Sequence, residues 1–408
     1  MKKIKFLTVL LVSALSGQEI NTDLLKAPAS PASNLLGVAS SEINKPTDVA
    51  DVMLGLQNLS DNFLKEGAYS MDFAPYWIFP GKTKNKTIGQ MFDEKYTVPQ
   101  TFVLSLAIKN TDSASTDLPV NSIYTGIGFK FSVLRGKATD ESKIVYEQIK
   151  NLLNENVSNI DEVSQEIIEK DQELIDLKAK RTRLVKDLSP SEQEIVIQST
   201  EYKLITAAIE KRLNTLKEVV DTQILTRQKY AENLKRIKEL YGDFKIERTG
   251  FLLDFAGGTS IQFRDKMFNS SKVYNVGLWS VFGYAFKKEG TPLFLLRYMY
   301  NPDSERMTTE GIVTESNFST FDAGLKYQYS PQNSKFTGSV EGIYRSFISG
   351  ADYKPDWKFI FNLNYEIWAN QHITLSLGKD FDNTIIKKGN AIAAISFISG
   401  LGTKRKIQ

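Results

Sequence analysis

The stretch WKFIFNLNYEI, residues 357–367, decides the fold class because its apolar side chains recur at every second position. One face of an extended segment would carry Trp357, Phe359, Phe361, Leu363, Tyr365 and Ile367, and the other Lys358, Asn362, Asn364 and Glu366. Side chains at positions i and i+2 lie on the same face of a β-strand. The pattern therefore predicts a strand with one apolar face and one polar face.

The same period of two recurs from Met71 to Arg135, and again from about Phe244 onward. The segments run about 10–14 residues, roughly twice the usual strand of a soluble protein and long enough to cross a bilayer at a tilt. A secreted β-sandwich also alternates, but its strands are shorter and its polar faces meet solvent. Aromatic residues near the segment ends resemble the girdles of membrane barrels: Tyr76, Trp77, Tyr298, Tyr300, Tyr327, Tyr329, Trp357 and Trp368.

We therefore predict a transmembrane antiparallel β-barrel with an inserted long antiparallel α-helical hairpin, a coiled coil. About eleven strands are recognisable, and we expect about 12 because bacterial single-chain barrels have an even number of strands. The predicted organisation is a signal peptide at 1–17, a tether or plug with a short helix at 18–68, barrel strands at 69–135, the helical insert at 136–243, further barrel strands at 244–402 and a basic tail at 403–408.

Charge and hydropathy exclude two large classes of protein. The 408 residues carry 51 Lys and Arg against 48 Asp and Glu, a formal net charge of +3 that gives no reason to expect a nucleic-acid partner. A mean hydropathy of −0.26 argues against a helical multi-span membrane protein. Barrel strands average apolar with polar residues, so this value remains compatible with a barrel in outer-membrane lipid.

Catalytic chemistry has few candidates in this sequence. The chain has no Cys and a single His, His372, which excludes disulfides, cysteine-bound zinc and any pair of histidine ligands. We therefore predict no enzymatic activity, no cofactor and no metal. The enzymatic alternative would place His372 beside Asp380 or Glu366 as a hydrolase site.

The start of the chain predicts export. Lys2, Lys3 and Lys5 precede an apolar run from Phe6 to Leu15, the pattern of a secretory signal peptide. Residues 18–60 are then rich in Ala, Pro, Ser and Asn, which is typical of a flexible tether. Within it, residues 47–56 have the pattern of a short amphipathic helix.

The central insert has a different periodicity. Residues 140–188 and 209–241 repeat apolar side chains at spacings of three and four, and Ser189 with Pro190 gives a helix-start signal between them. About 48 residues per arm at 1.5 Å each predict a rod of roughly 70 Å. We expect residues 140–241 to dock a partner protein. The polar residues predicted in the apolar seam either fix its register or leave grooves for a partner's helices: Lys170, Arg181, Gln223 and Arg227.

The polar faces of the strands supply charged candidates for the lumen. Both signs are present, so the charges can pair across the lumen and close it as well as line a selective pore. The candidates are Lys130, Arg248, Asp254, Arg297, Asp322, Lys326, Glu341, Arg345, Lys358, Glu366 and Asp380.

Connection lengths predict the orientation of the barrel. Periplasmic turns are usually the short ones, and the shortest joins are 287–290, 331–334 and 369–371. By the same parity the insert at 136–243 lies on the periplasmic side.

Several features together resemble uncharacterised outer-membrane barrels of Bacteroidota. These are the signal peptide, the Ala/Pro/Ser tether, the stretch Tyr69–Trp77 and the long strands, and the resemblance covers 69–135 and 244–402. It implies an outer-membrane location in a Gram-negative cell and transfers no site residues. Asp112-Ser113-Ala114 is similar to the O-glycosylation motif of exported Bacteroidota proteins, which makes Ser113 a candidate acceptor.

Two functions follow from these predictions. In the first, a non-enzymatic barrel uses its helical hairpin to dock a partner in an envelope transport, secretion or assembly complex. In the second, the barrel is a channel for small or hydrophobic solutes and resembles outer-membrane fatty-acid channels, with residues 18–68 as an N-terminal plug.

Overall fold

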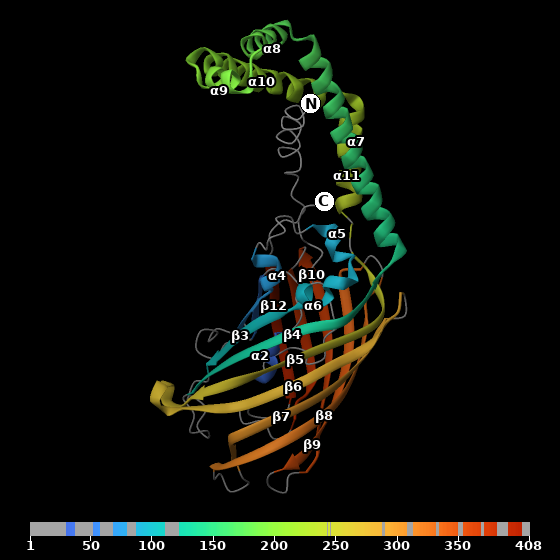
Figure 1. The fold of residues 1–408 in the computed structure, drawn as a ribbon. Coiled ribbons are helices and arrows are strands. Elements are labelled where there is room, and N and C mark those ends of the chain that lie inside the picture. The colour runs from blue at the N-terminus through green and yellow to red at the C-terminus, as the bar shows by residue number, and fades with distance from the viewer. Residues whose placement is uncertain are drawn as a thin grey trace. The chain divides into compact units, whose positions relative to one another are not determined.

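The computed structural model comprises a β-sheet unit and a helical unit (Figure 1). It describes residues 30–36, 52–57, 68–79, 87–110, 122–242, 244, 246–287, 290–307, 313–331, 334–349, 354–368, 371–381 and 391–401. The predicted signal peptide, the basic tail and Ser113 lie outside the described residues.

The sheet contains long antiparallel strands joined in chain order. The strands are β1 (Val52–Gln57), β2 (Ala68–Phe73), β3 (Val103–Asn110), β4 (Ile123–Ala138), β5 (Arg248–Phe263), β6 (Ser271–Ala285), β7 (Thr291–Met307), β8 (Val313–Tyr329), β9 (Phe336–Ser349), β10 (Asp356–Trp368), β11 (Gln371–Lys379) and β12 (Ala391–Leu401). From β2 to β12 each strand pairs with the next, and β1 pairs with both β2 and β12, so the hydrogen-bonded order is that of a closed barrel.

Strand β1 corrects one prediction. The sequence pattern at 47–56 predicted a short amphipathic helix, whereas Val52–Gln57 is a strand paired along its whole length on both sides. The segment is too short for its periodicity to separate helix from strand, and the unpaired edges of β2 and β12 decide the outcome.

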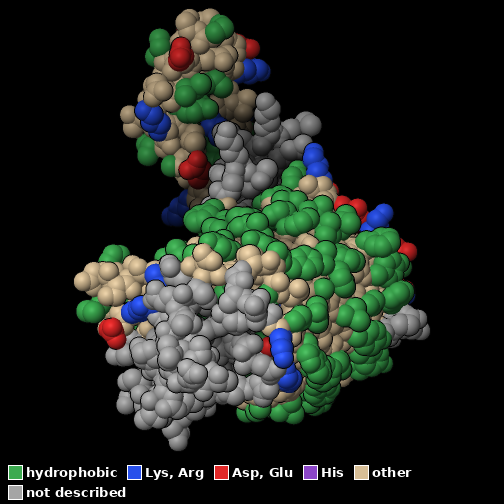
Figure 2. All heavy atoms as spheres, turned by 90° about the horizontal axis from the view of Figure 1, so that it is seen from below, with side chains coloured by type: hydrophobic (Ala, Val, Ile, Leu, Met, Phe, Trp, Pro, Cys, Tyr) green, Lys and Arg blue, Asp and Glu red, His purple; other side chains and the backbone are tan. Residues whose placement is uncertain are grey.

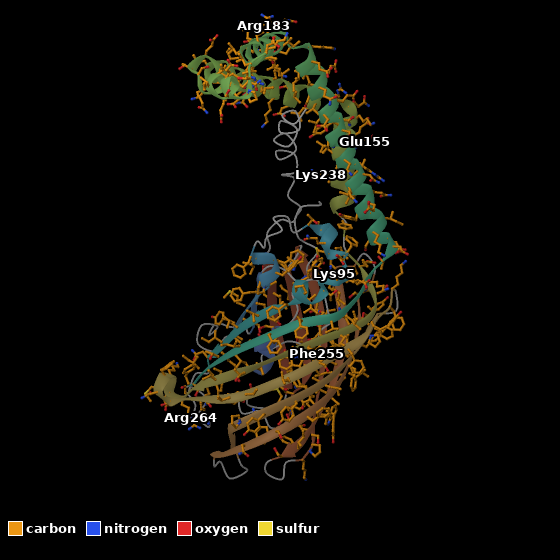
Figure 3. The ribbon with its side chains drawn as sticks, viewed as in Figure 1. Lys95, Glu155, Arg183, Lys238, Phe255 and Arg264 are labelled. Carbon is orange, nitrogen blue, oxygen red and sulfur yellow. The ribbon has the colours of Figure 1, made fainter. Side chains whose placement is uncertain are left out.

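The two faces of the strands differ as the alternation predicts. Outward side chains are large and apolar, including Phe251 at 71 % exposed and Leu325 at 62 %, whereas inward charged groups such as Asp322 are buried. Figure 2 shows the apolar side chains gathered over the outside of the barrel, and Figure 3 shows Phe255 of β5 on this wall. Exposing such a continuous apolar band to water would be unfavourable, and a band of this kind is typical of a lipid-facing surface.

Short helices follow β2 at one end of the barrel. They are α4 (Pro75–Ile78), α5 (Ile88–Met91), the 3₁₀ turn η1 (Glu94–Tyr96) and α6 (Thr97–Thr101). Tyr76 and Trp77, which we predicted at a strand end, therefore lie in a helix instead. Trp77 is buried and its Nε1 donates to the Gln100 carbonyl at 2.9 Å, so it fixes this segment and does not contribute to an aromatic girdle.

The insert between β4 and β5 is a separate compact unit of five helices. They are α7 (Asp140–Lys170), α8 (Gln172–Val185), α9 (Pro190–Gln198), α10 (Thr200–Thr226) and α11 (Gln228–Gly242). Ile160 of α7 packs with Val220 of α10, and Leu174 of α8 packs with Ile209 of α10, which makes the two arms antiparallel. Among the described residues, no helix is both long and apolar enough to cross a membrane.

Breaks in both arms contradict the predicted continuous rod. Asp171 has extended backbone and its carboxylate accepts from Leu174 N at 2.8 Å, which ends α7 and caps α8. Ser199 caps α10 in the same way through Tyr202 N, and the backbone of Arg227 is extended between α10 and α11. Asp and Ser side chains compete for backbone donors, so they favour new helix starts over continuation.

The predicted polar seam is also corrected. Lys170 and Gln223 are exposed instead of lying in the seam; Lys170 pairs with Glu166 at 2.9 Å. Arg227 lies at a helix break and reaches Glu166 at 3.6 Å, while Arg181 is half-buried on α8.

A pair of asparagines forms a buried polar contact between α7 and α11. Asn233 Nδ2 donates to Asn156 Oδ1 at 2.9 Å, and both residues are buried. A single buried amide pair between helices disfavours other registers, because sliding either helix would leave both amides unsatisfied. The sequence pattern did not single out either residue.

Candidate functional site: the interior of the barrel

A short helix from the N-terminal segment lies inside the barrel. Helix α2 (Pro31–Leu35) contacts β3, β4 and β5, and also β2 and β6. All five of its residues are buried, and the following Leu36 is 0 % exposed. One turn of helix is unstable alone, so contacts with the wall must hold this conformation.

Inward glycines make room for α2. A methyl group at Gly126 would lie 3.0 Å from the Ala32 carbonyl oxygen, and one at Gly258 would lie 2.9 Å from a methyl of Leu35. A larger side chain at Gly126 and α2 therefore exclude each other, whereas a side chain at Gly258 would first meet the β4 backbone at Ile127 and Gly128. We call these glycines the α2 seat: Gly126 and Gly128 of β4, Gly258 of β5 and Gly277 of β6.

Two hydrogen bonds orient α2 in the seat. Ala32 N donates to Ser105 Oγ at 3.0 Å, and Asn275 Nδ2 donates to the Leu35 carbonyl at 2.7 Å. Asn275 is held in turn by Ser260, whose hydroxyl donates to its Oδ1. The wall thus satisfies one backbone group at each end of the helix, which would otherwise be buried without a partner.

Much of the interior beside α2 is apolar, which the sequence analysis did not predict. Several inward positions of β5–β7 carry Leu, Val, Trp and Met, so parts of these strands are apolar on both faces. The buried cluster that includes Leu35 of α2 comprises Leu252, Ala256, Trp279, Val281, Ala285, Leu293, Leu295, Met299, Ile343 and Phe381. We call it the apolar interior cluster.

Strands β7–β9 carry several of the predicted charges. Arg297 of β7 and Arg345 of β9 both bind Asp322 of β8: Arg297 Nε lies 2.8 Å from Oδ2, and Arg345 Nε lies 2.8 Å from Oδ1. Lys326 and Glu341 pair at 3.8 Å between β8 and β9. The structure therefore brings five of the predicted inward charges into neighbouring positions on three strands.

The other predicted charges are distributed around the barrel. Lys358 pairs with Asp380 at 3.0 Å, and Lys130 with Asp254 at 3.3 Å, in both cases with buried side chains. Pairing between opposite signs, the alternative to a single-sign pore, is thus the arrangement in the described interior. In that part of the chain, no group of three or more His, Cys, Asp or Glu residues could hold a metal ion.

The hydrolase alternative predicted Asp380 or Glu366 beside His372, and one of these two carboxylates lies next to it. His372 of β11 lies directly opposite Glu366 of β10, whereas Asp380 is engaged with Lys358. A cross-strand pair of this kind stabilises a sheet without any catalytic role.

Two buried arginines hold the helices that follow β2. Arg248 Nη2 donates to the Met91 carbonyl at 2.6 Å, and Arg135 Nη2 donates to the same carbonyl at 2.9 Å and to Gln100 Oε1 at 2.6 Å. Arg135 is at the end of β4 and Arg248 begins β5, so both lie where the insert joins the barrel. We call this the Met91 contact.

Sequence reasoning singled out the charged groups but missed other residues that build the interior. Gly126 and Gly128 could be recognised as small inward positions, but nothing near them in sequence identified α2 as their occupant. Ser105, Asn275 and Arg135 are single polar residues on alternating strands and carry no motif.

No family model matches the chain, and no curated protein matches it. Solved structures do match. NanC porin is 9 % identical with a TM-score of 0.32, covering 86 % of this chain and 100 % of the porin. LpxR from Salmonella typhimurium is 7 % identical with a TM-score of 0.31, over 85 % and 98 %. The siderophore receptor PirA from Pseudomonas aeruginosa is 8 % identical with a TM-score of 0.19, over 82 % of this chain and 38 % of the receptor.

The strands themselves define the class of protein. They are long and antiparallel, with an apolar outward face, and charged pairs and an N-terminal helix lie inside. This is the architecture of an outer-membrane β-barrel.

Proposed function

We propose that this protein is a non-enzymatic barrel of the Gram-negative outer membrane that conducts small or hydrophobic solutes and is plugged by its N-terminal segment. The observation that carries the proposal is the burial of α2 against inward glycines. Four strands contribute to that contact through Ser105, the seat glycines and Asn275. A segment that served only as a flexible tether would not be expected to bury its residues inside the barrel.

Liposome swelling tests this proposal. Liposomes that contain the full chain should show almost no swelling with small sugars or short fatty acids. Liposomes that contain a chain lacking residues 28–40 should swell with at least one of them. Both chains must first resist protease in reconstituted liposomes to the same extent, which shows that the barrel has inserted. An inserted barrel that stays silent after this deletion counts against the plug.

A second candidate function concerns the insert, which would dock a protein partner of an envelope complex. The observation that favours it is apolar side chains left exposed on α9 and α10: Ile195 is 73 % exposed and Leu204 is 66 %. Replacing residues 140–241 with a short Gly/Ser turn should leave an inserted barrel but abolish partner co-purification. If a partner still co-purifies after the replacement, the docking proposal is contradicted.

The proposed orientation places the insert in the periplasm. The insert joins the barrel at the same end as the turn between β6 and β7, in which Phe286 N donates to the Gly290 carbonyl. Short turns of this kind are typical of the periplasmic end of a barrel. Trypsin should cut the basic run 178–186 only after the outer membrane is permeabilised. Cleavage in intact cells would place the insert on the cell surface.

A further inference from the structure

Helix α10 of the insert has one long exposed face. The side of α10 that packs against the other helices is apolar and buried, and includes Leu216 and Val220. With 3.6 residues per turn, side chains seven residues apart lie on nearly the same side of a helix. We call the side away from the buried one the outer face of α10, and it is defined by four exposed residues at every seventh position: Leu204, Lys211, Glu218 and Leu225.

The outer face has a large apolar residue at each end. Leu204 is 66 % exposed and Leu225 is 67 % exposed, and Val219 lies beside the face at 40 %. Small side chains let a second helix approach closely, so a contact along the whole face would remove both leucines from water. The small or uncharged residues between the leucines are Ala207, Asn214, Thr215 and Thr222.

The order of residues along the outer face is self-complementary. When a second α10 is laid antiparallel on the first about a point next to Thr215, Leu204 comes level with Leu225 of the second copy. Lys211 then comes level with Glu218, and each contact occurs twice because a two-fold axis relates the copies. A parallel pair would set like charges against each other at both positions. Within the described residues neither of these two charged side chains forms an ion pair, so both are available.

The flanking charges do not oppose this orientation. Arg212 is paired with Asp171 within its own chain at 2.6 Å. Glu210 comes beside the turn of the second copy that carries both Lys217 and Asp221, so attraction and repulsion largely offset each other there. The orientation therefore depends on the two central charges of the outer face.

We infer that the outer face of α10 binds the outer face of α10 in a second copy of this chain, antiparallel and with the two-fold axis beside Thr215. One helix face is a small interface, so the pair should be weak in dilute detergent. Barrels that share a membrane are confined near one another, which raises the effective concentration of their inserts. The inference requires neither the plug nor a second protein, and Ile195 on α9 lies outside the outer face.

Single cysteines test this inference, because the natural sequence has none. Full-length variants in outer membranes are oxidised with copper phenanthroline, and dimers are separated on non-reducing gels. Thr215→Cys lies beside its own copy at the axis and should form a disulfide-linked dimer. Thr222→Cys is also exposed on the outer face, but its copy lies roughly 20 Å away along the helices, so it should stay monomeric.

Two differently tagged chains test the register. Co-expressed Ala207→Cys and Thr222→Cys chains should cross-link to each other, because these two positions come level in the antiparallel pair. Neither chain should cross-link to itself.

Charge reversal tests which side chains face each other. In the Thr215→Cys chain, Lys211→Glu should lower the cross-linked fraction about fivefold, because two attractive contacts become repulsive. Glu218→Lys should have the same effect, and the two reversals together in one chain should restore cross-linking. Lys180→Glu, an exposed charge on α8, is the matched control and should leave the fraction unchanged.

Other outcomes overturn the inference in distinguishable ways. Cross-linking of Thr222→Cys to itself as readily as Thr215→Cys would indicate random collision or a parallel pair. A double reversal that fails to restore the dimer would show that Lys211 and Glu218 do not face each other. A Thr215→Cys chain that links only to a different protein would assign the outer face to that partner. If Thr215→Cys forms no dimer while the swelling assay still shows a plugged barrel, the inference fails and the proposed function stands.

Discussion

Two parts of the interior wall solve the same packing problem by opposite means. On β4–β6 the inward positions beside α2 are glycines, and a segment from the N-terminal region fills the space that they leave. On β8 and β9 the inward positions are long charged side chains that reach one another, as Arg345 and Asp322 do. Side-chain volume is thus supplied from outside the sheet in one part and from within it in the other.

The difference indicates where the barrel can change. Removing α2 from the glycine part breaks no contact between strands, so the sheet can survive its departure. The charged part has no separable occupant, because each pair links neighbouring strands. We therefore expect gating to involve the glycine part, and barrel stability to depend more on the charged part.

The largest effect should come from Gly126→Leu. The nearest atoms to a side chain at this position belong to Ala32, so the substitution should expel α2 and leave the strands intact. Solute flux in the liposome assay should approach that of the chain lacking residues 28–40. Gly342→Leu, where nothing lies within 4 Å, is the matched control and should remain silent. A silent Gly126→Leu barrel would remove the distinction between the two parts.

Asp322→Asn tests the charged part. It leaves Arg297 and Arg345 without their shared carboxylate, and removing one partner of a buried ion pair costs about 3–5 kcal/mol. The unfolding midpoint in urea, followed by the heat-modifiable shift on gels, should fall accordingly. Asp265→Asn, at an exposed connection, should change stability by no more than about 0.5 kcal/mol. Equal stability of the two variants would mean that the charged part does not hold the barrel.

Arg248→Met should have a smaller effect. It removes one of the two donors to the Met91 carbonyl while Arg135 remains, so the expected cost is about 1–3 kcal/mol in the same urea assay. The double variant with Arg135→Met should cost more than the sum of the single variants, because both guanidinium groups donate to the same carbonyl. Strict additivity would argue against a shared contact.

The smallest effect should come from ion pairs outside the barrel. The hydrogen bond from Arg212 holds the pKa of Asp171 below its usual value, so its stabilising effect is present above the ordinary carboxyl pKa of about 4 and is lost as pH falls through the lower folded value. Helical circular dichroism of the full chain should be constant from about pH 7 to 5 and decline slightly below pH 4. Asp171→Asn should reduce this decline, because Glu155 and Glu166 of the same helical unit also have lowered pKa values and remain. A decline of the same size in the variant would assign it to those other groups.

Much of the strand pattern could be predicted from local sequence, because facing depends only on alternation. Lys130, Asp254 and Arg297 occupy inward positions as their neighbours in sequence indicate. The breaks at Asp171 and Arg227 could not be predicted, since both residues occur inside helices elsewhere in proteins and their effect here depends on local capping.

The position of α2 inside the barrel could not be predicted from the sequence, for a different reason. Gly126 and Leu35 are distant in the chain, and neither has a periodic pattern that points to the other. Apolar residues inside β5–β7 also obscured the alternation: Trp279 and Leu295 pack in the buried cluster that contains Leu35 of α2, so polar residues at these positions would have no solvent. The sequence predicts the wall and leaves open what the wall surrounds.

The central claim, that α2 sits inside the barrel, can be tested by one disulfide. A Cβ at position 126 would lie 3.4 Å from Cβ of Ala32, close to the separation in disulfides, so Ala32→Cys with Gly126→Cys should oxidise in outer membranes. Loss of both thiols to a mass-tagged maleimide under denaturing conditions reports the bond. Leu106→Cys with Ile127→Cys, directly opposite in the β3–β4 ladder, shows that the oxidant reaches the barrel. The account predicts that both pairs oxidise; oxidation of the ladder pair alone would contradict it.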